Sequence, residues 1–169
     1  QEDITFLTRH TETLDLLRQA AVRPVCRFTR DYTRPSFDML LPEVQFFRDA
    51  ARILAASARY RASIGEMPAA LRDVSSIMKI SMHASSEPIL ICGLVGLAID
   101  GIAVGVLIDI LPFVDADDLA LLKRILVRRF RNLFLLGQKF PVPPRPVHRI
   151  ELLELVQHLQ ALLPLLAHK

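Results

Sequence analysis

The sequence predicts a single all-α domain, and three observations carry this prediction. The chain has 169 residues, the size of one ordinary domain with its own hydrophobic core. Leucine, alanine, arginine and isoleucine are abundant while glycine occurs six times, which is typical of helices rather than of β-sandwiches. Apolar residues recur every three or four positions between prolines. We expect about six helices, arranged as antiparallel hairpins packed around a central apolar helix over residues 87–112.

The N-terminal half predicts three of these helices. The first is expected from about Asp3 to Val22, where Pro24 ends it. The second is expected from about Pro42 to Ile64, with Gly65 directly after its end, and the third begins near Met67. The predicted inward face of the second helix consists of Phe46, Ala50, Ile53, Ser57, Tyr60 and Ile64. The other face of this helix is expected to carry Arg48, Arg52 and Arg59.

The second and third predicted helices form a helical hairpin. Leu54, Ala58, Gly65, Ala70 and Val74 follow the spacing of a tetratricopeptide unit, in which small residues let two antiparallel helices approach closely. A plain helical bundle with a tight turn at Gly65 fits the same residues. The arrangement is therefore expected to be tetratricopeptide-like or a bundle.

The most apolar run of the chain, Glu87 to Pro112, is long enough to cross a bilayer, which takes roughly twenty apolar residues. Asp100 lies near its middle, and an aspartate at the centre of a bilayer costs a few kcal/mol. Pro88 is expected at the first helical position, with the preceding serines as a cap. We therefore interpret the run as the central core helix of a soluble bundle. Asp100 is then a candidate buried acid, either paired with an arginine or lying at an exposed rim.

The remaining chain predicts a fifth helix, a linker and a sixth helix. Asp115 is expected to cap the N-terminus of the fifth helix. The predicted domain, residues 1–169, then comprises a core over 1–136, a proline-rich linker over 137–147 and a C-terminal helix over 148–169. The linker would return this last helix to the bundle or place it on a neighbouring subunit, which leaves a homo-oligomer open.

No motif of catalysis or cofactor binding occurs in the sequence. A phosphate-binding loop, a dinucleotide turn and a nucleophile elbow are all absent, and no two histidines have the spacing of a helical metal site. Cys26 and Cys92 are far apart in the sequence and lack metal-ligand spacing, so two free thiols are expected; a disulfide, which needs close approach and an oxidising compartment, is the alternative. We predict no catalytic residue, no metal and no cofactor, and therefore no enzyme; an assembled site of Asp100 with His83 or an arginine is the weaker alternative.

Basic residues concentrate in the C-terminal third, where Leu119 to Ile150 contains no Asp or Glu. Arg124, Arg128 and Arg131 share one helix face next to Lys123, which makes them candidates for contact with an anionic partner. The alternative is a solvated face that acids of the hairpin partly neutralise. The net charge is only +3 and aromatic residues are not interleaved, so nucleic acid is disfavoured as a partner. The neutralising acids would be Glu43, Asp49, Glu66 and Asp73.

Three consecutive segments carry a resemblance to a known family. They read "LLRQAAVRPVCRF", "LLPEVQFFRDAARILAASARYRASIGEMPAALRDV" and "SSEPILICGLVGLAID". Their order resembles a recurrent helical module of secreted or membrane-anchored proteins of planctomycete bacteria, over roughly Leu14 to Pro112. The resemblance implies a helical, repeat-like and extracytoplasmic module, periplasmic or anchored, and it implies no activity.

These observations together predict a non-catalytic helical interaction or scaffolding module that binds a protein or peptide partner. The alternative is a membrane-associated protein that contacts anionic lipid through the arginine-rich helix over residues 119–136.

Overall fold

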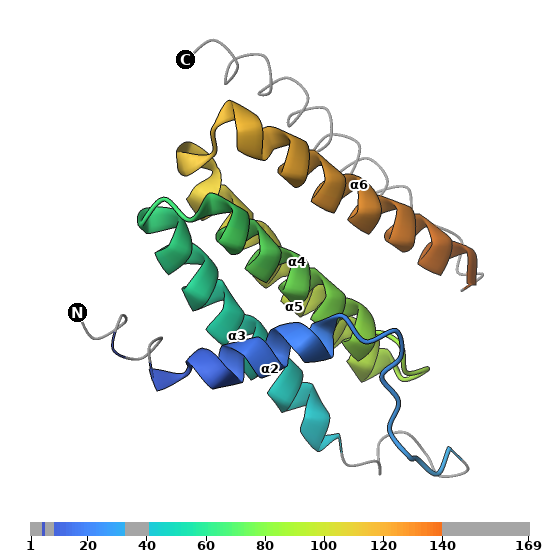
Figure 1. Cartoon of the computed structure of the whole chain (residues 1–169). Helices are drawn as coiled ribbons and strands as arrows, with labels where there is room; N and C mark the ends of the chain where they lie inside the picture. Colours follow the sequence, from blue (N-terminus) through green and yellow to red (C-terminus); the bar gives the residue numbers. More distant parts are fainter. Residues whose placement is uncertain (1–4, 6–8, 33–40, 140–169) are drawn as a thin grey trace. The chain divides into compact units, whose positions relative to one another are not determined.

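The computed structural model describes residue 5 and residues 9–32 and 41–139, and the regular structure in these residues is entirely helical (Figure 1). The all-α prediction is confirmed. The predicted C-terminal helix over 148–169 lies outside the described residues, as do residues 140–147 of the linker. The described elements are α2 (Thr11–Ala21), α3 (Pro42–Ser63), α4 (Met67–Ala84), α5 (Leu90–Ile110), the short 3-10 helix η2 (Leu111–Phe113) and α6 (Ala116–Lys139).

The chain divides into two compact units, Gln1–Phe113 and Val114–Lys169. The first unit contains α2 to η2, and the second contains α6. At the start of α6, the carboxylate of Asp115 accepts a hydrogen bond of 2.9 Å from the amide of Asp118, which confirms the predicted cap. Helix α6 continues to Lys139 and thus includes the first three residues of the predicted linker.

Helices α3 and α4 form the predicted hairpin. Pro42 opens α3, where its missing N–H leaves no helical hydrogen bond unmade. Gly65 follows α3 with a φ of 81°, a conformation that strains residues with a Cβ atom. The hairpin residues Leu54, Ala58, Ala70 and Val74 are completely buried.

The predicted inward face of α3 is displaced by about one position, although Ser57 is buried as predicted. Phe46 and Ile64 are exposed, and the buried positions are instead mostly alanines. Small side chains let the axes of packed helices come close, so the contact with α4 and α5 selects the alanine-rich face and leaves larger side chains at its margins. The buried residues of α3 are Glu43, Ala51, Leu54, Ala55, Ser57, Ala58 and Ala62.

Within the unit Gln1–Phe113, the central helix is α4, which corrects the expectation for residues 87–112. Twelve of the 18 residues of α4 are buried, because α2, α3 and α5 all pack against it. Six of the 21 residues of α5 are buried, along one face that packs against α3 and α4 (Figure 1). High hydropathy therefore did not identify the most buried helix.

The turn between α4 and α5 also differs from expectation. Helix α5 begins at Leu90, and Pro88 precedes it without opening it. The hydroxyls of Ser85 and Ser86 donate to carbonyl oxygens of α4, so these serines finish α4 and do not cap α5.

Candidate functional site

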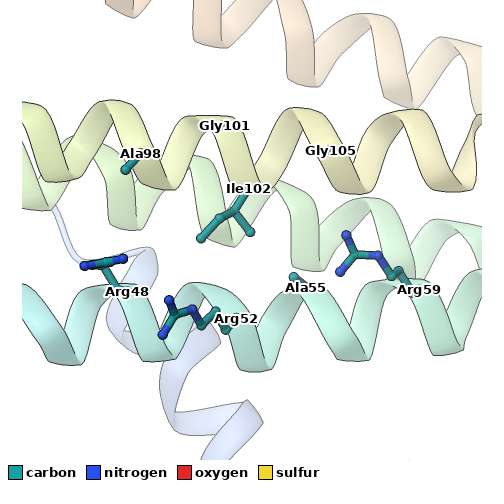
Figure 2. Close-up of a pocket in the computed structure, with 8 residues that line it drawn as sticks. All are labelled: Arg48, Arg52, Ala55, Arg59, Ala98, Gly101, Ile102 and Gly105. Carbon is teal, nitrogen blue, oxygen red and sulfur yellow. The ribbon is translucent and has the colours of Figure 1, made fainter.

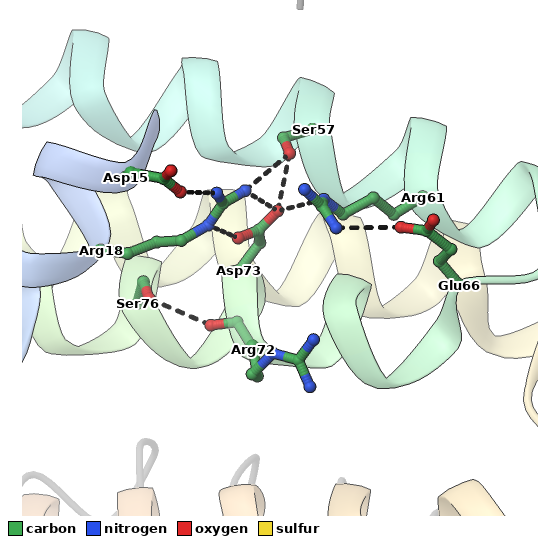
Figure 3. A network of polar contacts seen from close by, with 8 residues as sticks. All are labelled: Asp15, Arg18, Ser57, Arg61, Glu66, Arg72, Asp73 and Ser76. Atoms are coloured by element: carbon green, nitrogen blue, oxygen red, sulfur yellow. Dashed lines mark hydrogen bonds and ion pairs between the residues drawn. The ribbon is translucent and has the colours of Figure 1, made fainter. Parts of the chain in front are cut away.

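A buried carboxylate, Asp73 of α4, joins three helices of the first unit (Figure 3). Arg18 of α2 donates to both of its oxygens, from Nε at 2.6 Å and from Nη2 at 3.1 Å. Ser57 of α3 donates to Oδ2 at 2.7 Å, and Arg61 of α3 lies 3.6 Å from the same oxygen. The ion pair and hydrogen bonds with Asp73 raise the pKa of Arg18. Asp73 thus fixes α2 and α3 onto α4.

A second buried network attaches the segment after α2 to the start of α3 and to the turn between α4 and α5. Arg30 forms ion pairs with Glu43 and Glu87, and all three side chains are largely buried. Tyr32 donates its hydroxyl hydrogen bond to Glu87, and this bond raises the pKa of Tyr32. The guanidinium of Arg30 also lies 5.5 Å from the ring centroid of Phe28, a cation–π contact.

These networks correct the role that the sequence suggested for Glu43 and Asp73. Both were expected to neutralise a basic surface, whereas both are buried and bound by arginines of the first unit. A signal for Asp73 was present in the sequence, because it lies three residues after Ala70 and four before Ile77 on the buried face of α4. Each of these contacts joins one segment of the first unit to another, so we interpret both networks as structural.

The exposed side of α5 is a stripe of apolar residues. It consists of Leu90, Leu94, Leu97, Gly101, Val104 and Ile108, which we call the α5 face. The exposed fractions of Leu90, Leu97 and Ile108 are 78%, 66% and 65%. The six residues alternate spacings of four and three, which places them in one stripe along the helix. Contiguous exposed apolar surface of this kind marks interaction sites.

A groove between α3 and α5 borders the α5 face on one side (Figure 2). Arg48, Arg52 and Arg59 of α3 line it; we call them the arginine edge. The opposite wall is formed by α5, which carries only small residues there: Ala98, Gly101 and Gly105. Ile102 of α5 points toward α3. The groove is open to solvent and has a volume of about 580 Å³.

The predicted site residues fall on two helices. Asp100 is part-buried on α5 and takes part in an interaction of its own. Lys123 and Arg124 are exposed on α6. Arg128 and Arg131 belong to the same helix, but their side chains lie outside the described part of the structure. The three residues of the arginine edge were expected together on one face of this helix, because their spacing of four and seven residues is visible in the sequence, but they were not proposed as a site.

Three further residues named from the sequence have structural surroundings. His83 contacts the carbonyl oxygen of Ala21 through Nε2 at 3.3 Å, and so links the ends of α4 and α2. Cys26 and Cys92 are both free thiols, as predicted. Burial, with the nearby charge of Glu87, raises the pKa of Cys26 and keeps it in the less reactive thiol form.

Comparison with known proteins gives no relative: no family model matches the chain, and neither a curated protein nor a solved structure is similar to it. The resemblance to a planctomycete module therefore stays a prediction, and function is argued from the surface itself.

Proposed function

We propose that this chain is a non-catalytic helical interaction module that binds one α-helix of a partner protein along the α5 face. The exposure of that face is the observation that supports the proposal. A soluble helix normally turns its apolar side inward, and α5 does so through Ile99, Ala103 and Val106, yet an equally apolar stripe remains exposed on its other side.

The spacing of the α5 face indicates what kind of partner it suits. Alternating steps of four and three residues are the pattern by which one helix receives the side chains of a second helix at a shallow crossing angle. Gly101, in the middle of the stripe, would let the second helix approach most closely there. A helix with its own apolar seam matches this surface in shape and chemistry.

Two finer proposals accompany this one. The burial of Leu54, Ala58, Ala70 and Val74 supports a tetratricopeptide-like packing of the α3–α4 hairpin. An extracytoplasmic location is supported by the resemblance of residues 14–112 alone.

Membrane association is the second candidate function. The segment Leu90–Phe113 is long and apolar enough to cross a membrane. Its most apolar stretch of 18 residues has a mean hydropathy of 2.4 and is 33% buried. By length and composition, a core helix of a soluble protein passes the same test. In this alternative the arginine-rich helix over residues 119–136 would contact anionic lipid headgroups.

A binding experiment with the full chain tests the proposal. The probe is a fluorescent synthetic helix with leucine at both core positions of each heptad, titrated against the wild type and against Leu94→Glu/Leu97→Glu. We expect saturable binding to the wild type and at least a tenfold weaker affinity for the double variant, because each exposed leucine loses its apolar contact. Val22→Glu/Val25→Glu is the matched control, since both valines are exposed and neither belongs to α5.

The outcomes separate the two functions. Equal binding by the wild type and by the α5 variant would contradict the proposal. Flotation of the wild type with neutral or anionic vesicles, together with failure to bind the helix, would assign the α5 face to a membrane.

A further inference from the structure

The arginine edge lies along α3 beside the α5 face. Arg48, Arg52 and Arg59 occupy positions i, i+4 and i+11 of one helix, so their side chains leave α3 in nearly the same direction (Figure 2). At a rise of 1.5 Å per residue the row is about 16 Å long, which corresponds to about three turns of a helix lying alongside it.

Two of these arginines have weak local partners. Arg52 pairs with Asp49 at 3.1 Å, and Arg59 pairs with Asp109 at 2.7 Å, but all four side chains are about half exposed. Exposed ion pairs of this kind contribute little, so an incoming carboxylate can replace either aspartate at small cost. Arg48 is half-buried, and no ion pair joins it to another residue in the described ranges.

The groove walls favour contact with a chain rather than with a single small ion. Ala55 on α3 and Ala98, Gly101 and Gly105 on α5 carry little or no side chain. A helix resting on the α5 face would therefore hold the residues at one margin of its seam above the groove and within reach of the guanidinium groups. Partial removal of water there strengthens charge pairs relative to those in open solvent.

We infer that the partner helix is acidic, with glutamate or aspartate along the margin of its apolar seam that faces the arginine edge. This inference rests on the proposed function and adds the chemistry of the partner to it. Charge complementarity argues against a second copy bound antiparallel through α5, because that pairing would bring the two arginine edges to the same side of the interface.

Three synthetic helices test the inference. They share one leucine seam and carry glutamate, glutamine or lysine at the margin positions, and each is titrated against the full chain by fluorescence anisotropy. We expect the glutamate helix to bind about tenfold tighter than the glutamine helix, with the lysine helix weakest. The preference should shrink as salt is raised from 50 to 500 mM, because salt screens exposed charges.

Charge reversal in the protein identifies the arginines responsible. Arg48→Glu/Arg52→Glu should invert the order, so that the lysine helix binds best. Arg23→Glu/Arg27→Glu changes the net charge equally at exposed positions that do not line the groove and should keep the wild-type order.

The outcomes of these titrations distinguish the acidic-partner inference from the proposed function. Equal binding of the glutamate and glutamine helices would overturn the acidic partner and leave the proposed function standing. Failure of all three helices to bind would remove both. A concentration-dependent dimer that is lost in Leu94→Glu/Leu97→Glu would assign the α5 face to a second copy of the chain. Flotation with anionic vesicles that depends on Arg48 would assign the α5 face to a membrane. Either result would overturn the inference of an acidic partner helix.

Discussion

Asp73 shows how one residue type acts differently according to its surroundings. Its side chain is 1% exposed, and two arginines with one serine surround it, whereas Asp49 on α3 pairs with Arg52 while about half exposed. A buried ion pair is costly to break from one side, because the remaining charge keeps its desolvation cost without its partner. An exposed pair is replaced by water at little cost.

The substitution Asp73→Asn is therefore expected to lower the free energy of unfolding by about 2–3 kcal/mol, at the lower end for a buried pair because Arg18 is 23% exposed. The matched control Asp49→Asn should cost about 0–1 kcal/mol. Urea denaturation followed by circular dichroism measures both. Equal losses for the two variants would show that the Asp73 cluster does not hold α2 to the hairpin.

Helix packing depends on one close approach between α4 and α5. Ser81 donates a buried hydrogen bond of 3.0 Å to the carbonyl oxygen of Gly96. A Cβ atom at Gly96 would overlap the hydroxyl of Ser85 and lie 2.9 Å from the carbonyl oxygen of Ser81. The backbone oxygen has no rotamer by which to move away, so the two helices must separate to admit a methyl group.

We expect Gly96→Ala to destabilise the protein by about 1–3 kcal/mol, as overpacking does. Gly105→Ala on the same helix is the control, because nothing lies within 4 Å of its added Cβ atom and alanine favours helix by up to about 1 kcal/mol. The difference between the two variants in urea unfolding isolates the contact. A gain in stability for both would mean that α4 and α5 are not closely packed at Gly96.

The bounds of the helices could be predicted from the sequence more accurately than the extent to which each helix is buried. Pro42 and Gly65 place the bounds of α3 within one or two residues, because a missing N–H and a positive φ act locally. The position of α5 in the bundle could not be read from its hydropathy. Burial depends on how many helices surround an element, and α4 is central because α2, α3 and α5 all pack against it. The Asp73 cluster likewise combines Arg18, Ser57 and Asp73 from three helices. The spacing of the arginine edge could be recognised in the sequence, but its position beside α5 could not be predicted because it depends on the tertiary structure.

At the scale of the whole chain, the unit Gln1–Phe113 contains everything that the proposed function needs. The fully buried side chains Leu54, Leu71, Ile77 and Ile99 belong to it, as do the Asp73 cluster and the α5 face. A segment with its own core and its own polar contacts is expected to fold alone.

A fragment of residues 1–113 is therefore expected to unfold cooperatively in urea, with coincident transitions by circular dichroism and by tyrosine fluorescence. Asp73→Asn should lower its stability by about as much as in the full chain, because both partners of the ion pair lie within the fragment. The same fragment with Leu94→Glu/Leu97→Glu is the control for association through the α5 face, because association would obscure the unfolding transition. If both fragments unfold gradually while the full chain unfolds in one step, residues 114–169 contribute to a single shared core, and the chain folds as the one domain that its length and composition predict.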